Sequence, residues 1–484
     1  MGLTQNMNRR RATSASAFLS LAIVTGACAT DSDIADGEEP PPELTQGGPA
    51  DIDLDTVPRG QEIDFGPAPA TPDGAYAPEV AVAVEILFSQ PLQFFGGEES
   101  SALQTLGASG DVRVGWLLSD LMRVSQDPAL NQQIAAASSE LLQKDIPAFT
   151  GWNELTSTLI AWDIPAPPDY LAAKRVVYAA VDPRWVPLFD DNSTVDWRFV
   201  SWGGVLIDDR AYDTTDELCN CIPAADNPTV QTADEATWLE DDTVIFGVVI
   251  NGEARAYPRR IMEVREMVND TLGGRDFAMP YCTLCGAAQV WFTDDLPEDI
   301  ERPIFRTSGL LIRSNKVMYD LTSGSIFDTF RGEAETGDLL DRGIQLNGHT
   351  VVTSTWGAWV EENPDTTVLI EDLALGRDFD FRGEDGRDNA GPIFPIGDVD
   401  PRLPVQEDIV GILQADGTPL AIHVASAVNA LNAGQTIELD DGVQVVSGGD
   451  GIRVIDAAGE EVTAHQAFWF AWSQFHEGTE LWPG

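Results

Sequence analysis

A repeated glycine-containing hairpin is the feature of this sequence that most limits what the chain can fold into. Asp242–Pro258 reads DTVIFGVVINGEARAYP, and its Asn251-Gly252 pair is a strong signal for a tight turn between two antiparallel strands. Asp408–His423 reads DIVGILQADGTPLAIH, with a glycine again in the first strand and an Asp-Gly turn. Aligned with one inserted residue, the two segments predict a duplicated half-domain.

Two further patterns divide the rest of the chain. Apolar residues recur at helical spacing in DVRVGWLLSDLMRV (Asp111–Val124), and Asp127-Pro128 is typical of a helix start. Further along, short Val- and Ile-rich runs alternate with turn residues, which indicates strands. We therefore expect an α+β fold. A helical domain at residues 76–200 precedes a β-rich domain at residues 201–484, built from two related halves as a barrel or sandwich.

The N-terminus has the pattern of an export signal. Residues 1–28 contain no acid, and three arginines (residues 9–11) precede a short apolar run, Ala17–Val24, and small residues ending at Cys28. A basic start, an apolar centre and a small-residue cleavage site describe a secretory signal peptide, and the apolar run is too short to span a bilayer. A cysteine at the cleavage point predicts lipidation of Cys28, and hence a lipoprotein on the outer membrane or cell surface.

Charge and composition exclude some partners of the exported chain. Residues 29–75 are acidic and rich in proline and glycine, which predicts a disordered tether. Over the whole chain 28 Lys and Arg stand against 79 Asp and Glu, a net charge of −51. Nucleic acids and anionic surfaces require clustered positive charge, so we expect no nucleic-acid partner and a membrane contact through the lipid alone.

Long motifs in a fixed order surround the second part of the chain. They include ARAYPRRIMEVREMVNDTLGGR (Ala254–Arg275), MPYCTLCGAAQVWFTDD (Met279–Asp295), RTSGLLIRSNKVMYDLTSGSIFDTFRG (Arg306–Gly332), PIFPIGDVDPRLPVQ (Pro392–Gln406) and FWFAWSQFHEGTELW (Phe468–Trp482). With the helical segments, they make residues 111–484 resemble the bacterial family catalogued as domain of unknown function 3179. The resemblance implies an exported or membrane-attached protein and no particular reaction.

Two positions depart from the pattern of that family. The family usually has histidine where this chain has Arg265 and again where it has Asn363, whereas His476 matches the family pattern. If either missing histidine supports a metal or a proton transfer in relatives, this chain lacks that function.

Four cysteines beyond the leader are the main candidates for chemistry: Cys219, Cys221, Cys282 and Cys285. In an exported protein an even number of cysteines first indicates disulfides. We expect one member of each pair to bond to the other pair, because a bridge between Cys219 and Cys221 looks strained. Four thiolates could instead hold Zn(II) or Cu(I), and a CxxC pair ahead of a glycine could perform thiol redox chemistry. These three alternatives remain open, and so does the question of whether the chain binds a cofactor at all.

Polar residues of the same motifs form a second group of candidates. A cleft near Cys282 and Cys285 is predicted to contain these side chains: Glu266, Asp270, Asn315, Tyr319, Asp320 and His476. The alternative is that the Asn-Asp and Tyr-Asp pairs satisfy buried turns.

The combined prediction is an exported, lipid-anchored cell-envelope protein with a binding or structural role, and coordination of a metal through Cys282 and Cys285 is one of the roles left open for it. A periplasmic thiol- or metal-dependent oxidoreductase that uses the same cysteines is the alternative.

Overall fold

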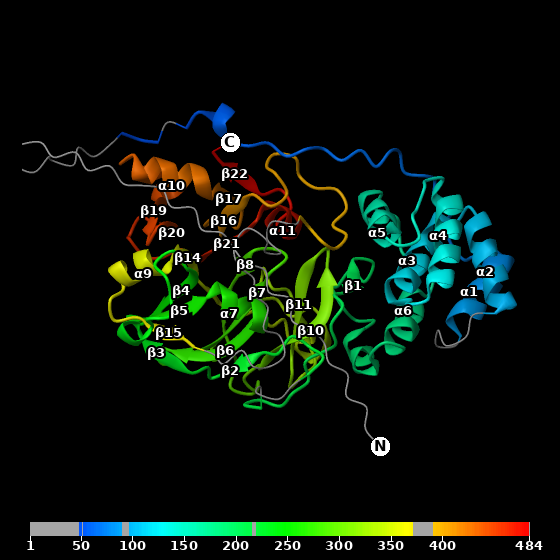
Figure 1. The fold of residues 1–484 in the computed structure, drawn as a ribbon, viewed down its shortest axis with the longest axis horizontal. Coiled ribbons are helices and arrows are strands. Elements are labelled where there is room, and N and C mark those ends of the chain that lie inside the picture. Colours follow the sequence, from blue (N-terminus) through cyan, green and yellow to red (C-terminus); the bar gives the residue numbers. More distant parts are fainter. Residues whose placement is uncertain (1–47, 51, 90–95, 215–218, 371–390, 484) are drawn as a thin grey trace, which may run out of the picture. The chain divides into compact units, whose positions relative to one another are not determined.

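The computed structural model describes residues 48–50, 52–89, 96–214, 219–370 and 391–483 (Figure 1). Contacts between residues place Gln46–Gly484 in one compact unit, distinct from Met1–Thr45. The predicted leader, Cys28 and residues 29–47 of the predicted tether lie outside the described residues. In the described part of that tether, Ala50 N donates to Thr436 O (2.8 Å) and Gly60 N to Pro401 O (3.1 Å). Among the helices that the structure describes, none has both the length and the apolar character to cross a bilayer.

Helices occupy the N-terminal part of this unit, as the apolar spacing predicted. Those before the first strand are α1 (Pro78–Phe88), α2 (Gly97–Ala108), α3 (Gly115–Val124), α4 (Pro128–Leu142), α5 (Gly151–Ala161) and α6 (Tyr170–Ala179). The apolar residues of α3 and of the turn before it are at most 7 % exposed: Val114, Leu117, Leu118, Leu121 and Val124. Asp127 caps α4 by accepting a hydrogen bond from Ala129 N (2.8 Å), with Pro128 in the first turn. The predicted start of this helix is therefore confirmed.

A buried ion pair joins α3 to α6. Lys174 Nζ lies 2.7 Å from Asp120 Oδ1, and Tyr170 OH donates to Asp120 Oδ2 at 2.8 Å. Both members of the pair are buried, Lys174 being 1 % exposed and Asp120 5 %. Because each charge has its partner and further hydrogen bonds, the pair is tolerated in the apolar interior of the helices.

The helices share their core with a β-sheet instead of closing a core of their own. The sheet runs in the order β1 (Val200–Trp202), β10 (Phe305–Ile312), β11 (Asn315–Asp320) and β12 (Ile326–Phe327). Leu310, Val317 and Ile326 from these strands belong to the same buried apolar cluster as the helices. Trp185, which follows α6, donates its indole N–H to Ser308 O at 2.6 Å. The expectation of a helical region followed by a separate β-architecture is therefore wrong.

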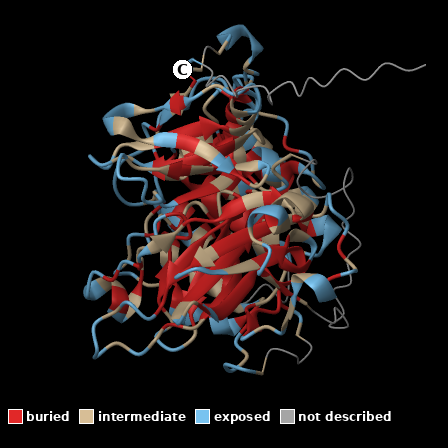
Figure 2. Ribbon diagram, turned by 90° about the vertical axis from the view of Figure 1, so that its left-hand side faces the viewer, coloured by how far each residue is buried: buried red, intermediate tan, exposed pale blue. Residues whose placement is uncertain are grey.

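The β-structure of the described residues is divided into five small sheets. Beside the sheet above, they are β13-β9-β7-β6-β2 with β8 on β7, β14-β4-β5-β15-β3, β21-β16-β17-β22 and β18-β19-β20. The bounds of these strands are β2 (Ala225–Asp226), β3 (Val230–Thr232), β4 (Val244–Ile250), β5 (Glu253–Pro258), β6 (Met267–Leu272), β7 (Arg275–Cys282), β8 (Ala287–Ala288), β9 (Val290–Phe292), β13 (Gly348–His349), β14 (Val352–Thr355), β15 (Thr367–Leu369), β16 (Asp408–Leu413), β17 (Pro419–His423), β18 (Ile437–Glu438), β19 (Gln444–Gly448), β20 (Gly451–Ile455), β21 (Ala464–Phe468) and β22 (Glu480–Trp482). Most of their residues are buried (Figure 2).

The predicted barrel or sandwich is contradicted by this division. A barrel closes one sheet and a sandwich packs two, whereas five separate small sheets resemble in number the blades of a five-bladed β-propeller. The prediction failed because long segments of chain separate the strands that belong to the repeat. Those segments form sheets of their own. The repeat therefore accounts for two sheets of five and does not supply two halves of one barrel.

Two of the sheets contain the same structural module. In the first module (residues 244–258 and 352–369), β14 pairs antiparallel with β4, and β15 returns parallel to β5. In the second module (residues 408–423 and 464–482), β21 pairs antiparallel with β16, and β22 returns parallel to β17. The returning segments carry α9 (Trp356–Glu362) and α11 (Trp469–Phe475), and the other short helices are α7 (Arg259–Arg265), α8 (Gly337–Asp341) and α10 (Val424–Asn432).

Each module packs a tryptophan against a strand glycine. A Cβ added to Gly247 would lie 2.3 Å from Trp359, and one added to Gly411 would lie 2.2 Å from Trp472. The indole N–H groups donate to corresponding threonines, Trp359 to Thr366 (3.0 Å) and Trp472 to Thr479 (2.8 Å). The glycines of the repeat are thus required by close packing on the face of the strand.

Candidate functional site

The four cysteines form two disulfides, each within its own motif. Cys219 bonds to Cys221 and Cys282 bonds to Cys285. The Cα atoms are 5.1 Å apart in the first pair and 5.4 Å apart in the second, and both separations fall within the normal range for disulfides. The predicted cross-pairing between the two motifs is therefore wrong, because the backbone of the CxC segment already brings its own cysteines to bonding distance.

The CxxC disulfide lies inside the protein. Cys282 ends β7 and is 4 % exposed, and Cys285 is fully buried. Phe468 N donates to Cys285 O at 2.8 Å, which ties the loop to the second module. An attacking thiolate must reach a sulfur atom for disulfide exchange, so this burial favours a structural cross-link.

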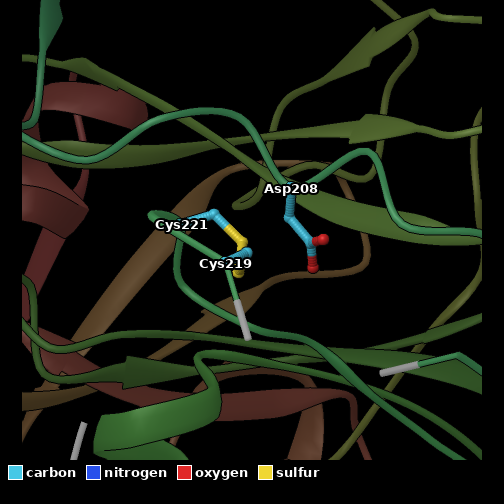
Figure 3. A group of neighbouring side chains, drawn as sticks. All are labelled: Asp208, Cys219 and Cys221. Atoms are coloured by element: carbon cyan, nitrogen blue, oxygen red, sulfur yellow. A yellow bond between two sulfur atoms is a disulfide. The ribbon is translucent and has the colours of Figure 1, made fainter. Parts of the chain in front are cut away.

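The CxC disulfide has a carboxylate beside it. One ligand atom from each of Asp208, Cys219 and Cys221 lies within 4.8 Å of the other two, the one such group found in the described residues (Figure 3). The carboxylate of Asp208 accepts hydrogen bonds from Arg210 Nε (2.7 Å) and Ala224 N (3.0 Å). A metal would need both sulfurs as thiolates, and in this structure they are bonded to each other.

Glu266 is the predicted cleft residue that lies at the CxxC motif. It follows α7 and is 5 % exposed. Thr283 Oγ1 donates to Glu266 Oε1 at 3.3 Å, and Lys316 Nζ lies 3.3 Å from Glu266 Oε2. Glu266, Lys316 and Cys282 line a cavity of about 60 Å³, which has room for little more than water.

Four of the other predicted residues serve separate local structures. Asp270 accepts from Arg255 (2.6 Å) and Tyr257 (2.7 Å), while Tyr319 donates to Asp208 O (2.6 Å). Asp320 accepts from the backbone N–H groups of residues 304 and 323, and Asn315 donates to the carbonyl of residue 313.

The two departures from the family pattern are also built into local structure. Arg265 is buried and donates to Pro223 O at 3.4 Å. Asn363 ends α9 and donates its side-chain N–H to Trp359 O at 3.3 Å.

His476 lies in a different and larger hollow, which we call the histidine cleft. The cleft has a volume of about 570 Å³, and the residues that line it include Phe330, Arg331, His465, Trp472 and His476. His465 comes from β21 and His476 from the end of α11, so both belong to the second module. The ring of Trp472 lies 3.9 Å from that of His476 and 5.7 Å from that of His465, measured between centroids.

The two histidines of the cleft differ from the other two in their hydrogen bonding. His349 Nε2 is bonded to Val249 O (2.7 Å), and His423 is bonded to both Ser426 and Glu407. His465 and His476 are 8 % and 7 % exposed, and the Nε2 atom of each is buried without a partner. A buried polar atom without a partner costs about 1–3 kcal/mol and points to a ligand or a functional role.

Burial keeps both imidazoles neutral. It lowers the pKa of His465 to about 4. The pKa of His476 falls to about 3, first through burial and then through repulsion by His465 and Arg331. At neutral pH each ring therefore presents a nitrogen lone pair, which can accept a hydrogen bond or bind a metal.

Two acids near Arg331 are perturbed in the opposite direction. Burial raises the pKa of Asp328 to about 6, with Arg331 opposing the shift. The pKa of Glu335 rises to about 8, again mainly through burial and then through repulsion by Asp328. Groups with perturbed pKa values concentrate at functional sites, so this stretch together with the cleft is the strongest site candidate in the described residues.

Sequence reasoning selected His476 and did not select His465. The missed signal is the Trp-x-x-Trp spacing shared by residues 356–359 and 469–472, which extends the repeat to the segment that holds His476. The second histidine of the cleft, His465, comes from β21, which pairs this residue with Gly411 of β16.

Comparison with known proteins identifies a family and nothing more specific. The model of a family described as "Protein of unknown function (DUF3179)" matches residues 219–458, so the predicted resemblance to that family is confirmed over this stretch. His465 and His476 lie beyond the matched residues. No curated protein and no solved structure matches the chain.

Proposed function

We propose that this relative of the DUF3179 family is an exported ligand-binding protein whose ligand occupies the histidine cleft. A lipid on Cys28 would hold it at the cell envelope, and the segment between Cys28 and the compact unit that begins at Gln46 would separate that unit from the membrane. The two disulfides support an oxidising compartment, because such bonds persist mainly outside the cytoplasm.

One observation carries the choice of site. Two histidines that line the cleft each have a buried imidazole nitrogen with no partner, whereas the other two histidines of the chain are hydrogen-bonded. A ligand that bonds to His465 and His476 would recover the free energy lost by their burial. The aromatic rings of Phe330 and Trp472 supply the apolar surface that most binding pockets have.

The cysteines do not carry this proposal. The sulfurs of Cys282 and Cys285 are bonded to each other and buried, so coordination of a metal there would first require their reduction. The same burial removes the support for a thiol oxidoreductase at this motif.

The test compares mature protein purified from the envelope of its source with a variant whose cleft is filled. Thr463 is an exposed residue of the cleft wall, so Thr463→Trp places an indole in the space without disturbing the core. Native mass spectrometry should find a bound mass on the wild-type protein and none on the variant. Equal masses on both proteins would refute the site.

The anchor has an independent test. Labelled fatty acid should be incorporated into the wild-type protein and not into Cys28→Ala. Incorporation that survives this substitution would refute lipidation at Cys28, without bearing on the cleft.

A further inference from the structure

The two cleft histidines pack against the same aromatic rings. Trp472 contacts both of them, and Phe330 lies 5.7 Å from His465 and 6.4 Å from His476 between ring centroids. The rings of Phe330 and Phe475 are stacked at 4.8 Å, which closes this aromatic wall. The imidazoles are therefore fixed by packing and not by hydrogen bonds to described residues.

The backbone on which they stand is also fixed. His465 is paired with Gly411 in the register of β16 and β21. His476 ends α11, and its own N–H donates to Trp472 O at 2.9 Å. With the backbone held and the rings packed, a shared ligand would meet a nearly pre-organised pair of nitrogens.

Charge favours a positive ligand over an anion. The chain carries a net charge of −51, and Glu333 lines the cleft. The one Lys or Arg among the described residues that line the cleft, Arg331, already donates to Phe475 O (2.5 Å), and its Nε lies 3.8 Å from Asp328 Oδ2. Such a field raises the local concentration of cations and opposes the approach of anions.

We propose that the histidine cleft binds a d-block cation, Zn(II) or Cu(I), through the imidazole nitrogens of His465 and His476. This inference rests on the proposed function and names the chemical class of its ligand. Imidazole nitrogen suits both metals, and two protein ligands leave positions open for water or a small exogenous ligand. Glu333 also lines the cleft and is the carboxylate available there as a further ligand.

The first module serves as an internal comparison. Val352 pairs with Gly247 as His465 pairs with Gly411. Asn363 ends α9 with φ −124° and ψ 69°, and His476 ends α11 with φ −124° and ψ 72°. The same scaffold thus carries no imidazole at either position of the first module, so we expect metal binding at the second module alone.

The experiment uses mature protein from the envelope, stripped with a chelator and labelled with ¹⁵N-histidine. The chain has four histidines, so the ring nitrogens give four resolvable spin systems in long-range NMR spectra. Titration with Zn(II), and separately with Cu(I) under argon, should shift the nitrogens of His465 and His476 and leave those of His349 and His423 in place. Both ions are diamagnetic, so the signals remain observable.

Variants then test the assignment. His465→Phe and His476→Phe should each weaken binding by roughly 100-fold, since even the partners of metal ligands are worth about 10–100-fold. His349→Asn is the matched control, because His349 is bonded to Val249 O outside the cleft. The affinity of this variant for the metal should equal that of the wild-type protein. The wild-type spectra decide the question even if a histidine variant fails to fold.

Failure of this inference can be told apart from failure of the proposed function. If neither metal shifts the two cleft histidines, or if affinity persists in both phenylalanine variants, the metal is excluded. A bound organic mass that Thr463→Trp removes would then retain the cleft as a binding site. If no bound mass is found either, both proposals fail.

Discussion

Replacing Gly411 with alanine tests whether the glycine of the repeat positions the cleft. The new Cβ would lie 2.2 Å from Cζ3 and 2.3 Å from Cε3 of Trp472, where ordinary contacts begin at 3.4 Å. The indole must therefore move by roughly 1 Å, and it is only 2 % exposed and packed against the rings of His465 and His476. Because the indole contacts both cleft histidines, its displacement should reach them as well.

The cost can be worked out from the contacts that change. Overpacking of this kind costs about 1–3 kcal/mol. Loss of the hydrogen bond from Trp472 Nε1 to Thr479 Oγ1 adds about 1 kcal/mol, and the lower chain entropy of alanine returns about 0.5–1 kcal/mol. We expect a net loss of about 1–3.5 kcal/mol in the free energy of unfolding, measured by urea denaturation.

The first module provides the matched control. Gly247→Ala places a Cβ 2.3 Å from Trp359 and should cost a similar amount, but it leaves the NMR signals of His465 and His476 unchanged. Gly411→Ala should shift both signals. Trp472→Phe removes the clashing atoms, so the double variant should lose less stability than the sum of the single losses. A cost below about 0.5 kcal/mol for both glycine variants, or histidine signals that move equally in both, would refute the packing argument.

Three other outcomes are expected. Lys174→Met should lower the free energy of unfolding by about 3–5 kcal/mol, because it leaves the buried carboxylate of Asp120 without its partner. A loss under 1 kcal/mol in urea denaturation would contradict this expectation. Burial raises the pKa of Asp328 from 3.8 to about 6. The protonated side chain therefore contributes about 3 kcal/mol to stability below pH 4, and this contribution is lost as the pH rises through 6. Asp328→Asn should flatten this part of the pH–stability profile, and an unchanged profile would contradict the expectation. Titration of native protein should find no reactive thiol at Cys282 or Cys285, whereas replacing both with alanine should cost about 2 kcal/mol in unfolding free energy.

Local sequence signals predicted the local structure correctly. The Asn251-Gly252 turn joins β4 to β5, and both residues adopt positive φ as such a turn requires. The helix start at Asp127 follows from its side chain and from Pro128. Each of these features depends on residues close together in the chain, so it can be read without knowledge of the fold.

Long-range features were less accessible. The sequence does not say that Leu310 and Val317 pack into the helical core, because a strand buried on both faces resembles any other apolar run. The sequence also does not show that Phe330 contacts His465 and His476, because this contact depends on where the sheets between the two modules lie in the fold. The disulfide prediction failed for a related reason, because Cα separations follow from backbone geometry and not from spacing alone.

Comparison of the two modules separates what the fold needs from what the cleft needs. At one position the scaffold accepts Val352, which is buried and has no polar side-chain atom to satisfy. At the other it accepts Asn363, whose side chain bonds to Trp359 O. In the second module the same positions hold His465 and His476, each with a buried nitrogen that has no partner. Because the first module shows that this backbone folds without imidazoles, packing alone does not account for the pair, and the proposed ligand of the cleft rests on this difference between the modules.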